Sequence, residues 1–306
     1  MRAGCRGAER GFVLVAVLFV ATLLLGSAVS FALFARNEVR RSRSEEFALE
    51  ARSLAVIAFD NVSEWIALDK NDFDSAREPL YSPSIPIMLS FGEWRVFVRI
   101  VPQGGLIPIN GLFLPDGVTV RKEYLYPWRE IWTLLGRQDT ASLVLDFLDG
   151  DAVPRVGSRE DESFPNRSVS DLSELLHLPE IDRVLLYGNE PSDLSLSRFF
   201  SVYGDHTVNV NIAPGEVLGL LDPDLGPDNA KAIVAYRTGT VIRDAKNLIK
   251  IPGFPRAAIT RLKDIIGYKS IYFSVNVKVQ KAADERSFTA IMKRSDKRCE
   301  IVNWRE

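Results

Sequence analysis

The sequence has few of the residues on which metal centres and crosslinked scaffolds depend. Among its 306 residues are two cysteines and two histidines, so a disulfide-rich scaffold and a multi-histidine metal site within one chain are excluded. Neither sign of charge prevails, because 38 Lys and Arg residues face 40 Asp and Glu residues and leave a net charge of −2. That balance gives no global basic field that would gather nucleic acid.

Several enzyme motifs are also missing. The sequence contains no Gly-x-Ser-x-Gly, no Gly-x-x-x-x-Gly-Lys and no His-Glu-x-x-His, so a nucleophile-elbow hydrolase, a P-loop protein and a zinc protease have no support. The hydrophobic share of 46% and the charged share of 25% are typical of globular proteins. We therefore expect a folded protein of about two domains that is not an enzyme.

What the sequence does contain is one long apolar run near its N-terminus. Gly11 to Ala35 carries no charged residue, and its length exceeds the roughly 20 apolar residues that a spanning helix needs. Arg2, Arg6 and Arg10 precede it, and positively charged flanks stay in the cytoplasm. The pattern predicts a single-pass protein of the bacterial inner membrane whose globular part lies in the periplasm.

Three interpretations of this segment compete. A plain anchor helix needs only the apolar run. A cleaved secretory signal has a shorter apolar core of about 7–15 residues, although Ala28-Val29-Ser30 is an acceptable cleavage triplet. The third is a leader of the type IV pilin kind, a short charged segment that ends in Gly before Phe and an apolar helix. Arg10-Gly11-Phe12 fits that pattern, with cleavage between Gly11 and Phe12.

The next stretch favours the pilin-like interpretation. No Gly or Pro occurs from Ser27 to Arg77, and apolar residues recur at helical spacing at positions 47, 51, 54, 58, 62 and 65. The apolar run and this amphipathic stretch therefore predict one helix from Phe12 to Asp69, about 87 Å long. A filament subunit needs such a helix, whereas a simple anchor rarely does.

One position departs from ordinary pilins. Their fifth mature residue is usually Glu, and counting from Phe12 the corresponding residue here is Ala16. In filaments that Glu neutralises the amino terminus of the subunit assembled before it, and a carboxylate buried in lipid needs such a partner. A subunit without it has no earlier neighbour to pair with, or stays outside the filament shaft. A simple anchor would also lack it.

The rest of the chain predicts strands near its two ends and helices between them. Strands are expected at 85–89, 92–101, 271–279, 287–292 and 298–304. Helices are expected at 128–135, 140–148, 169–176, 181–186, 215–221, 229–237, 244–248 and 256–266. We expect an α+β, pilin-like fold: a long N-terminal helix, transmembrane in its first half, packs on a small antiparallel sheet that carries a large, mainly helical insertion.

Two stretches resemble a known family. Leu143 to Asp151 (LVLDFLDGD) is followed by Pro154-Arg155 and Glu160, and Val208 to Pro214 (VNVNIAP) is followed by Val217-Leu218. They are similar to the LDWxDxDxxPR-like and NxNxAPxxVL-like stretches of the minor pseudopilin K of type II secretion (general secretion pathway protein K). That family also lacks the Glu near the leader. Phe147 departs from the family's Trp.

The resemblance covers the whole chain in order. It implies a prepilin leader at 1–11, the transmembrane half of the helix at 12–35, and the first part of a pilin-like module at 36–111. A helical insertion domain of the SAM/helix-hairpin-helix kind would follow at 112–268, and the C-terminal strands of the pilin-like module at 269–306. Gly11 and Phe12 would be read by a prepilin peptidase, which also methylates the new amino terminus in this family.

Two groups of residues in these motifs are candidate sites. The resemblance implies calcium binding at Asp146, Asp149, Asp151 and Glu160, whose closely spaced carboxylates suit a hard cation. The alternative is a helix end with solvated acids and Asp-mediated turns. No other cofactor is implied. Asn209, Asn211 and Pro214 precede a predicted helix and are expected to close turns and cap it.

The expected function is structural. The resemblance implies a minor pseudopilin at the tip of the type II secretion pseudopilus, which with minor pseudopilins I and J initiates assembly of the major pseudopilin G. The alternative is a membrane-anchored, competence-like DNA-binding protein, because 225–237 and 251–255 look like helix-hairpin-helix segments. Both turns have lost a glycine, and Asp224 would repel phosphate, so we expect no nucleic-acid partner. An anchored periplasmic protein without a filament role is the third hypothesis.

Overall fold

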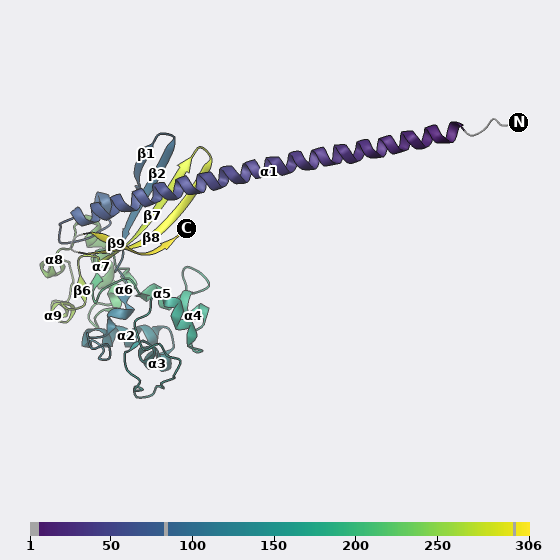
Figure 1. Cartoon of the computed structure of the whole chain (residues 1–306). Coiled ribbons are helices and arrows are strands. Elements are labelled where there is room, and N and C mark those ends of the chain that lie inside the picture. The colour runs from purple at the N-terminus through teal and green to yellow at the C-terminus, as the bar shows by residue number, and fades with distance from the viewer. Residues whose placement is uncertain (1–5, 83–84, 296–297) are drawn as a thin grey trace. The chain divides into compact units, whose positions relative to one another are not determined.

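The computed structural model describes residues 6–82, 85–295 and 298–306, and the chain forms two compact units, Met1–Leu54 and Ala55–Glu306. The helix α1 (Arg6–Leu68) supplies most of the first unit and the first residues of the second. The expected long N-terminal helix is thus confirmed as one uninterrupted element (Figure 1). We refer to Ala55–Glu306 as the globular unit.

The first unit carries the apolar run on the surface of α1. Large apolar side chains from Phe12 to Phe34 are exposed, Phe12 at 76% and Phe31 at 72%. The hydroxyls of Thr22 and Ser27 donate to the carbonyls of Phe19 and Leu23 within the same helix, at 2.8 and 2.9 Å. These two hydroxyls therefore have hydrogen-bond acceptors within their own helix, as a lipid environment without water requires.

In the globular unit, five antiparallel strands form one sheet in the order β1-β2-β7-β8-β9, as the expected fold class requires. Their bounds are β1 Ile87–Phe91, β2 Trp94–Pro102, β7 Tyr272–Lys281, β8 Asp284–Arg294 and β9 Cys299–Arg305. Val96, Val98 and Ile100 alternate into the core and pair in register with Val279, Val277 and Val275. This period of two leaves one face of the sheet to be covered.

The last turns of α1 cover that face. Ala55, Ala58, Phe59, Val62 and Ile66 are fully buried. The rings of Phe59 and Trp304 meet edge to face at 4.9 Å. Ser63 donates its hydroxyl to the Cys299 carbonyl at 2.7 Å and accepts from the Cys299 N–H at 3.1 Å. Burial raises the pKa of the Cys299 thiol to about 11, so this cysteine is an inert core residue.

The part of the chain between β2 and β7, which we call the helical segment, has a hydrophobic core of its own. Its buried apolar residues, from Ile107 to Ile266, form one cluster. Trp128 contacts the rings of Trp132 and Phe200 at 5.5 and 5.3 Å within it. The α-helices are α2 Lys122–Leu134, α3 Ala141–Leu148, α4 Arg183–Tyr187, α5 Leu196–Phe199, α6 Gly215–Leu220, α7 Gly226–Gly239, α8 Ala245–Ile249 and α9 Ala258–Leu262.

Two of the expected helices take a different form in the structure. The helix expected at 169–176 is a 3-10 helix, Leu172–His177, which begins at a capping box formed by Asp171 and Glu174. The helix expected at 256–266 ends at Leu262, and Ile266–Gly267 is instead a short strand, β6. Two-residue strands have no periodicity, so sequence patterns do not detect them.

Short parallel pairs connect the helical segment internally. β5 (Val208–Asn209) pairs with β6, and β3 (Ile107–Pro108) pairs with β4 (Phe200–Ser201). β3 follows β2 closely and β6 precedes β7, so both pairs lie where the helical segment joins the sheet. Figure 1 shows this junction between the strands and the helices.

The β7–β8 hairpin stores a small amount of backbone strain. Its two-residue turn has Ala282 at φ +52, whereas the β1–β2 turn has Gly92 at φ +59 in the corresponding position. For a residue with a Cβ, this backbone conformation costs about 1 kcal/mol of conformational free energy relative to the right-handed region. We expect Ala282→Gly to raise the unfolding free energy by about 0.5 kcal/mol, measured by thermal or urea unfolding.

The neighbouring alanine is the matched control. Ala283 has no positive φ, so Ala283→Gly gains no relief and lowers stability by about 0.5 to 1 kcal/mol through the entropy of the unfolded chain. Equal destabilisation by both substitutions would show that the turn is not strained at Ala282.

Candidate functional site

The N-terminal candidate residues lie within α1. Gly11 and Phe12 are inside the helix, and Ala16 is exposed on its surface. The segment Phe12–Leu68 has a mean hydropathy of 2.7 over its most apolar stretch, which makes it the candidate membrane span of the described chain. At Ala16 the helix therefore offers an apolar surface and no carboxylate.

Three of the four predicted calcium ligands lie together. Ligand atoms of Asp149, Asp151 and Glu160 all fall within 4.8 Å of one another. Asp149 ends α3 as its C-cap, and Asp151 and Glu160 lie on the loop that follows. We call these three residues the acidic cluster.

Asp146 has a different partner. It is fully buried in the last turn of α3, and its two carboxylate oxygens accept from the Arg155 Nη1 at 2.7 Å and the Arg155 backbone N–H at 3.1 Å. The same Nη1 also donates to Asp149, and Nη2 donates to the Val118 carbonyl at 2.8 Å. Arg155 thus joins the loop to the helix end and gives each Asp146 oxygen a donor.

The acidic cluster itself is left with excess negative charge. Burial raises the pKa of Asp149 in spite of its bond to Arg155, and burial with the nearby charges of Asp146 and Asp149 raises the pKa of Glu160. Both Glu160 carboxylate oxygens and Asp149 Oδ1 are buried and have no hydrogen-bond partner among the described residues. Unpaired buried carboxylate oxygens are costly, which indicates that a cation or proton is needed here.

A calcium ion fits these donors. Ca²⁺ takes about six to eight oxygen ligands in flexible geometry, and waters or carbonyls commonly complete a set of carboxylates. Asp149, Asp151 and Glu160 would hold it and Asp146 would not, because Arg155 already occupies both Asp146 oxygens. The ion would supply charge neutralisation and would fix the loop after α3.

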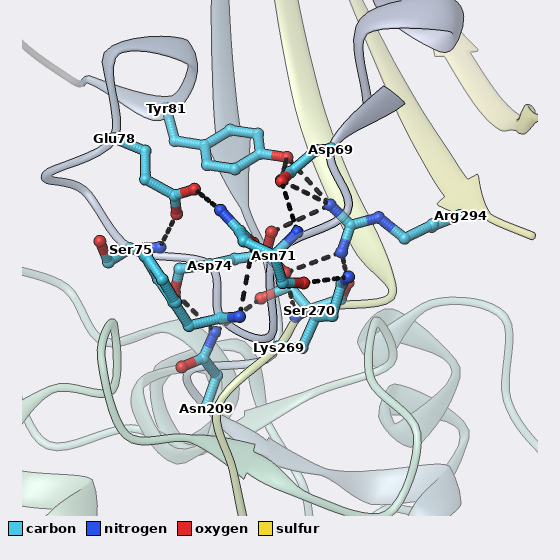
Figure 2. Close-up of polar contacts among 11 residues, drawn as sticks. Asp69, Asn71, Asp74, Ser75, Glu78, Tyr81, Asn209, Lys269, Ser270 and Arg294 are labelled. Carbon is cyan, nitrogen blue, oxygen red and sulfur yellow. Dashed lines mark hydrogen bonds and ion pairs between the residues drawn. The ribbon is translucent and has the colours of Figure 1, made fainter. Parts of the chain in front are cut away.

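A second polar cluster lies where the helical segment meets the sheet, and its centre is Arg294 of β8 (Figure 2). The guanidinium binds both Asp74 oxygens at 2.9 Å and reaches Asp69 at 3.2 Å. Tyr81 accepts from it at 2.9 Å and donates to Asp69 at 2.7 Å. Burial raises the pKa of Asp74, and the contact with Arg294 counteracts that shift.

Asn209 connects this cluster to the helical segment. Its Nδ2 donates to the Asp74 carbonyl at 3.1 Å and to the Ser270 hydroxyl at 3.0 Å, while its Oδ1 accepts from the Asn211 N–H at 3.0 Å. The Ser270 N–H in turn donates to Asp74 at 2.5 Å. Asn209 is fully buried, so each of these bonds replaces one to water.

Asn211 and Pro214 organise the chain before α6. Asn211 exchanges two hydrogen bonds with the backbone of Ile242, at 2.8 and 2.9 Å, and so bridges to the start of the α8 region. Pro214 is the N-cap of α6 and its carbonyl accepts from Leu218 N–H at 3.0 Å. The three residues Asn209, Asn211 and Pro214 thus occupy turn and cap positions, as the sequence predicts.

The segment that suggests a DNA-binding hairpin is occupied by an internal ion pair. Arg261 of α9 binds both oxygens of Asp222, at 2.6 and 2.8 Å, and also contacts Asp224. Arg261 lowers the pKa of Asp222 against the opposing effect of burial. Arg261 therefore pairs with carboxylates of the protein, and Asp222 and Asp224 would repel a phosphate at this turn.

Comparison with known proteins supports the fold. No family profile matches the sequence, and no curated protein matches it. The structure is similar to a chain in "The Crystal Structure of the GspK-GspI-GspJ complex from enterotoxigenic Escherichia coli Type 2 Secretion System", with a TM-score of 0.63 and 14% identity. The match covers 87% of this chain and 98% of that chain, so it cannot leave out the helical segment. The two chains share a fold.

The sequence does not point to the Arg294 cluster. Arg294 and Asp74 are 220 residues apart, and no motif joins them. Arg155 follows the acidic stretch closely and could have been proposed as its partner, because an arginine a few residues after buried acids is a natural counter-ion.

We expect Arg155→Ala to lower the unfolding free energy by about 3 kcal/mol or more, because it leaves two buried carboxylates without their counter-ion. Urea unfolding of the full chain measures the loss. Arg159→Ala is the control, since Arg159 lies on the same loop as Arg155 but is exposed, and its partner is the partly exposed Glu180 at 2.8 Å. A loss no larger than that of the control would contradict the structural role of Arg155.

Proposed function

We propose that this chain is a minor pseudopilin of type II secretion, of the K kind, and that it caps the tip of the pseudopilus. The observation that carries the proposal is the shared fold with a chain of the GspK-GspI-GspJ complex, which spans nearly the whole of both chains. The chain has a structural rather than an enzymatic role. It initiates filament assembly for protein export across the outer membrane.

The N-terminal helix supports this role. Its exposed apolar surface suits the inner membrane before assembly and packing against other helices afterwards. The leader would be removed by a prepilin peptidase between Gly11 and Phe12 and the new amino terminus methylated. The globular unit would lie in the periplasm.

Two features favour the tip over the shaft. Ala16 supplies no carboxylate to neutralise the amino terminus of an earlier subunit. The first subunit of a filament has no earlier neighbour, so only there does the missing carboxylate cost no interaction. The helical segment adds a second hydrophobic core beside the sheet, a bulk that a repeating shaft position does not need. Minor pseudopilins I and J are the proposed neighbours, and the major pseudopilin G follows them.

Calcium belongs to the same proposal. We propose that the acidic cluster binds one Ca²⁺, held by Asp149, Asp151 and Glu160, and that the ion orders the loop after α3 in the calcium-rich exterior of the inner membrane. Its support is the set of buried carboxylate oxygens without partners. No other cofactor is proposed.

The function is tested on protein purified from its native membrane. We expect the mature chain to begin at Phe12 with a methylated amino group, by intact mass and N-terminal sequencing, and to copurify with two other minor pseudopilins. Gly11→Val should block cleavage, because the peptidase reads that residue, whereas the control Gly7→Val should leave it unchanged. An intact Met1 would indicate a plain anchor, and a start near Phe31 a secreted domain; either result would remove the basis of the proposal.

Calcium binding is tested by thermal unfolding of the full chain in detergent. We expect Ca²⁺ to raise Tm relative to EDTA, and Glu160→Gln to abolish most of that rise. Glu162→Gln is the matched control, because Glu162 is exposed two residues away and outside the acidic cluster. An equal rise in wild type and Glu160→Gln would refute the site.

The stability of the calcium-free protein and the effect of Ca²⁺ on Tm should both depend on pH. Because the folded pKa values of Asp149 and Glu160 are raised, the folded apo protein holds protons that the unfolded chain has released. Their contribution to apo stability is therefore present at low pH and lost as pH rises through those folded values. Calcium competes with these protons, so the Tm rise it causes should be larger at pH 7.5 than at pH 5.

A further inference from the structure

A cavity of about 610 Å³ opens beside the junction of the helical segment and the sheet. Its walls come from the loop after α1, the turn after β2, the chain before α6, and the end of α7. Apolar groups of Val101, Leu106, Ile212 and Pro214 line it. Its volume falls within the roughly 300–1,000 Å³ of small-molecule sites.

The charged side chains that line this cavity are all positive. Arg77 and Arg237 line it, and among the described residues that form its walls none is acidic. Arg155, Arg261 and Arg294 elsewhere in the globular unit each contact two carboxylates. The two arginines of this cavity therefore differ from these three, because no carboxylate contacts either of them among the described residues.

Arg237 is the more constrained of the two. It lies in the last turn of α7 and donates one hydrogen bond, from Nη1 to the Val210 carbonyl at 2.6 Å. Burial lowers its pKa, and no carboxylate in the described chain counteracts that shift. Its other N–H groups make no hydrogen bond within the described residues, although a guanidinium has five donors.

Arg77 reaches the same place from the loop after α1. Its Nη1 donates to the Thr238 carbonyl at 2.7 Å, one residue beyond Arg237. Both arginines thus meet the C-terminal end of α7, where the helix dipole favours cations. Arg77 is exposed and Arg237 is half-buried, and beyond these bonds neither side chain has an acceptor among the described residues, so both have donors free for a ligand.

We propose that this cavity binds an organic carboxylate with an apolar body, whose carboxylate pairs with Arg237 and Arg77 and whose body lies against the apolar wall. A guanidinium and a carboxylate match in geometry and can form two parallel hydrogen bonds. The carboxylate comes either from the chain end of a peptide or from a small organic acid. The proposal is independent of the pseudopilin function and of the acidic cluster.

Binding is tested by isothermal titration of the full chain in detergent with two probes that share this chemistry. Acetyl-valyl-leucine represents a peptide chain end, and 4-methylpentanoate represents a small acid. We expect at least one of them to bind, and its neutral amide to bind about tenfold more weakly or worse, because a charge-assisted hydrogen bond is lost. Binding by the peptide alone identifies a chain end, and binding by 4-methylpentanoate identifies a small acid.

Variants locate the site. Arg77→Gln and Arg237→Gln should each weaken binding about tenfold. Lys231→Gln is the matched control, since it removes one positive charge from the same helix α7 at a residue outside this cavity. Arg77→Gln decides the test if Arg237→Gln unfolds the protein. No binding by either probe, equal binding of acid and amide, or equal effects of Arg77→Gln and Lys231→Gln would overturn the proposal.

Discussion

The buried ion pair between Arg294 and Asp74 holds the parts of the globular unit in one arrangement. Arg294 ends β8, Asp74 follows α1, and Asn209, which donates to the Asp74 carbonyl, belongs to the helical segment. A buried guanidinium and a buried carboxylate are each costly alone, and their cost is offset only when both sit in register with the surrounding donors. The network is therefore favourable in only one relative arrangement of β8, the loop after α1 and the helical segment.

An arginine also binds buried carboxylates at the end of α3, but there the negative charges outnumber the positive one. Arg155 meets two buried carboxylates there, but Asp149 and Glu160 keep oxygens that no protein donor reaches. One positive charge faces the four carboxylates of the motif and its loop. In the Arg294 network both Asp74 oxygens have donors and only Nε of Arg294 lacks a partner among the described residues, whereas the acidic cluster keeps three buried carboxylate oxygens without one. This difference supports the proposal that a cation binds at the acidic cluster and not at Arg294.

The elements that could be predicted from the sequence are those with local periodicity. The uninterrupted α1 follows from the absence of Gly and Pro after Ser27, and the sheet follows from alternation as in Val96, Val98 and Ile100. The β5–β6 pair and the bond between Arg294 and Asp74 could not be predicted, because each joins residues distant in the chain. For the acids, the sequence could have indicated Arg155 as a counter-ion of the acidic stretch, but not which carboxylates it contacts, because that depends on how the loop folds back.

A polar seam between two apolar cores explains why these networks lie where they do. The buried apolar residues of the helical segment cluster together without those of the sheet and of α1 after Leu54. Two separate cores cannot fix each other's orientation through non-directional hydrophobic contact, so directional bonds must do it. Asn209, which donates to the Asp74 carbonyl, and Arg294, which donates to the Ser270 carbonyl, provide such bonds, and the cavity lined by Arg77 and Arg237 lies at the same seam. A carboxylate bound there would add a further directional contact between the two cores, which makes the seam the place where a ligand could influence the rigidity of the whole globular unit.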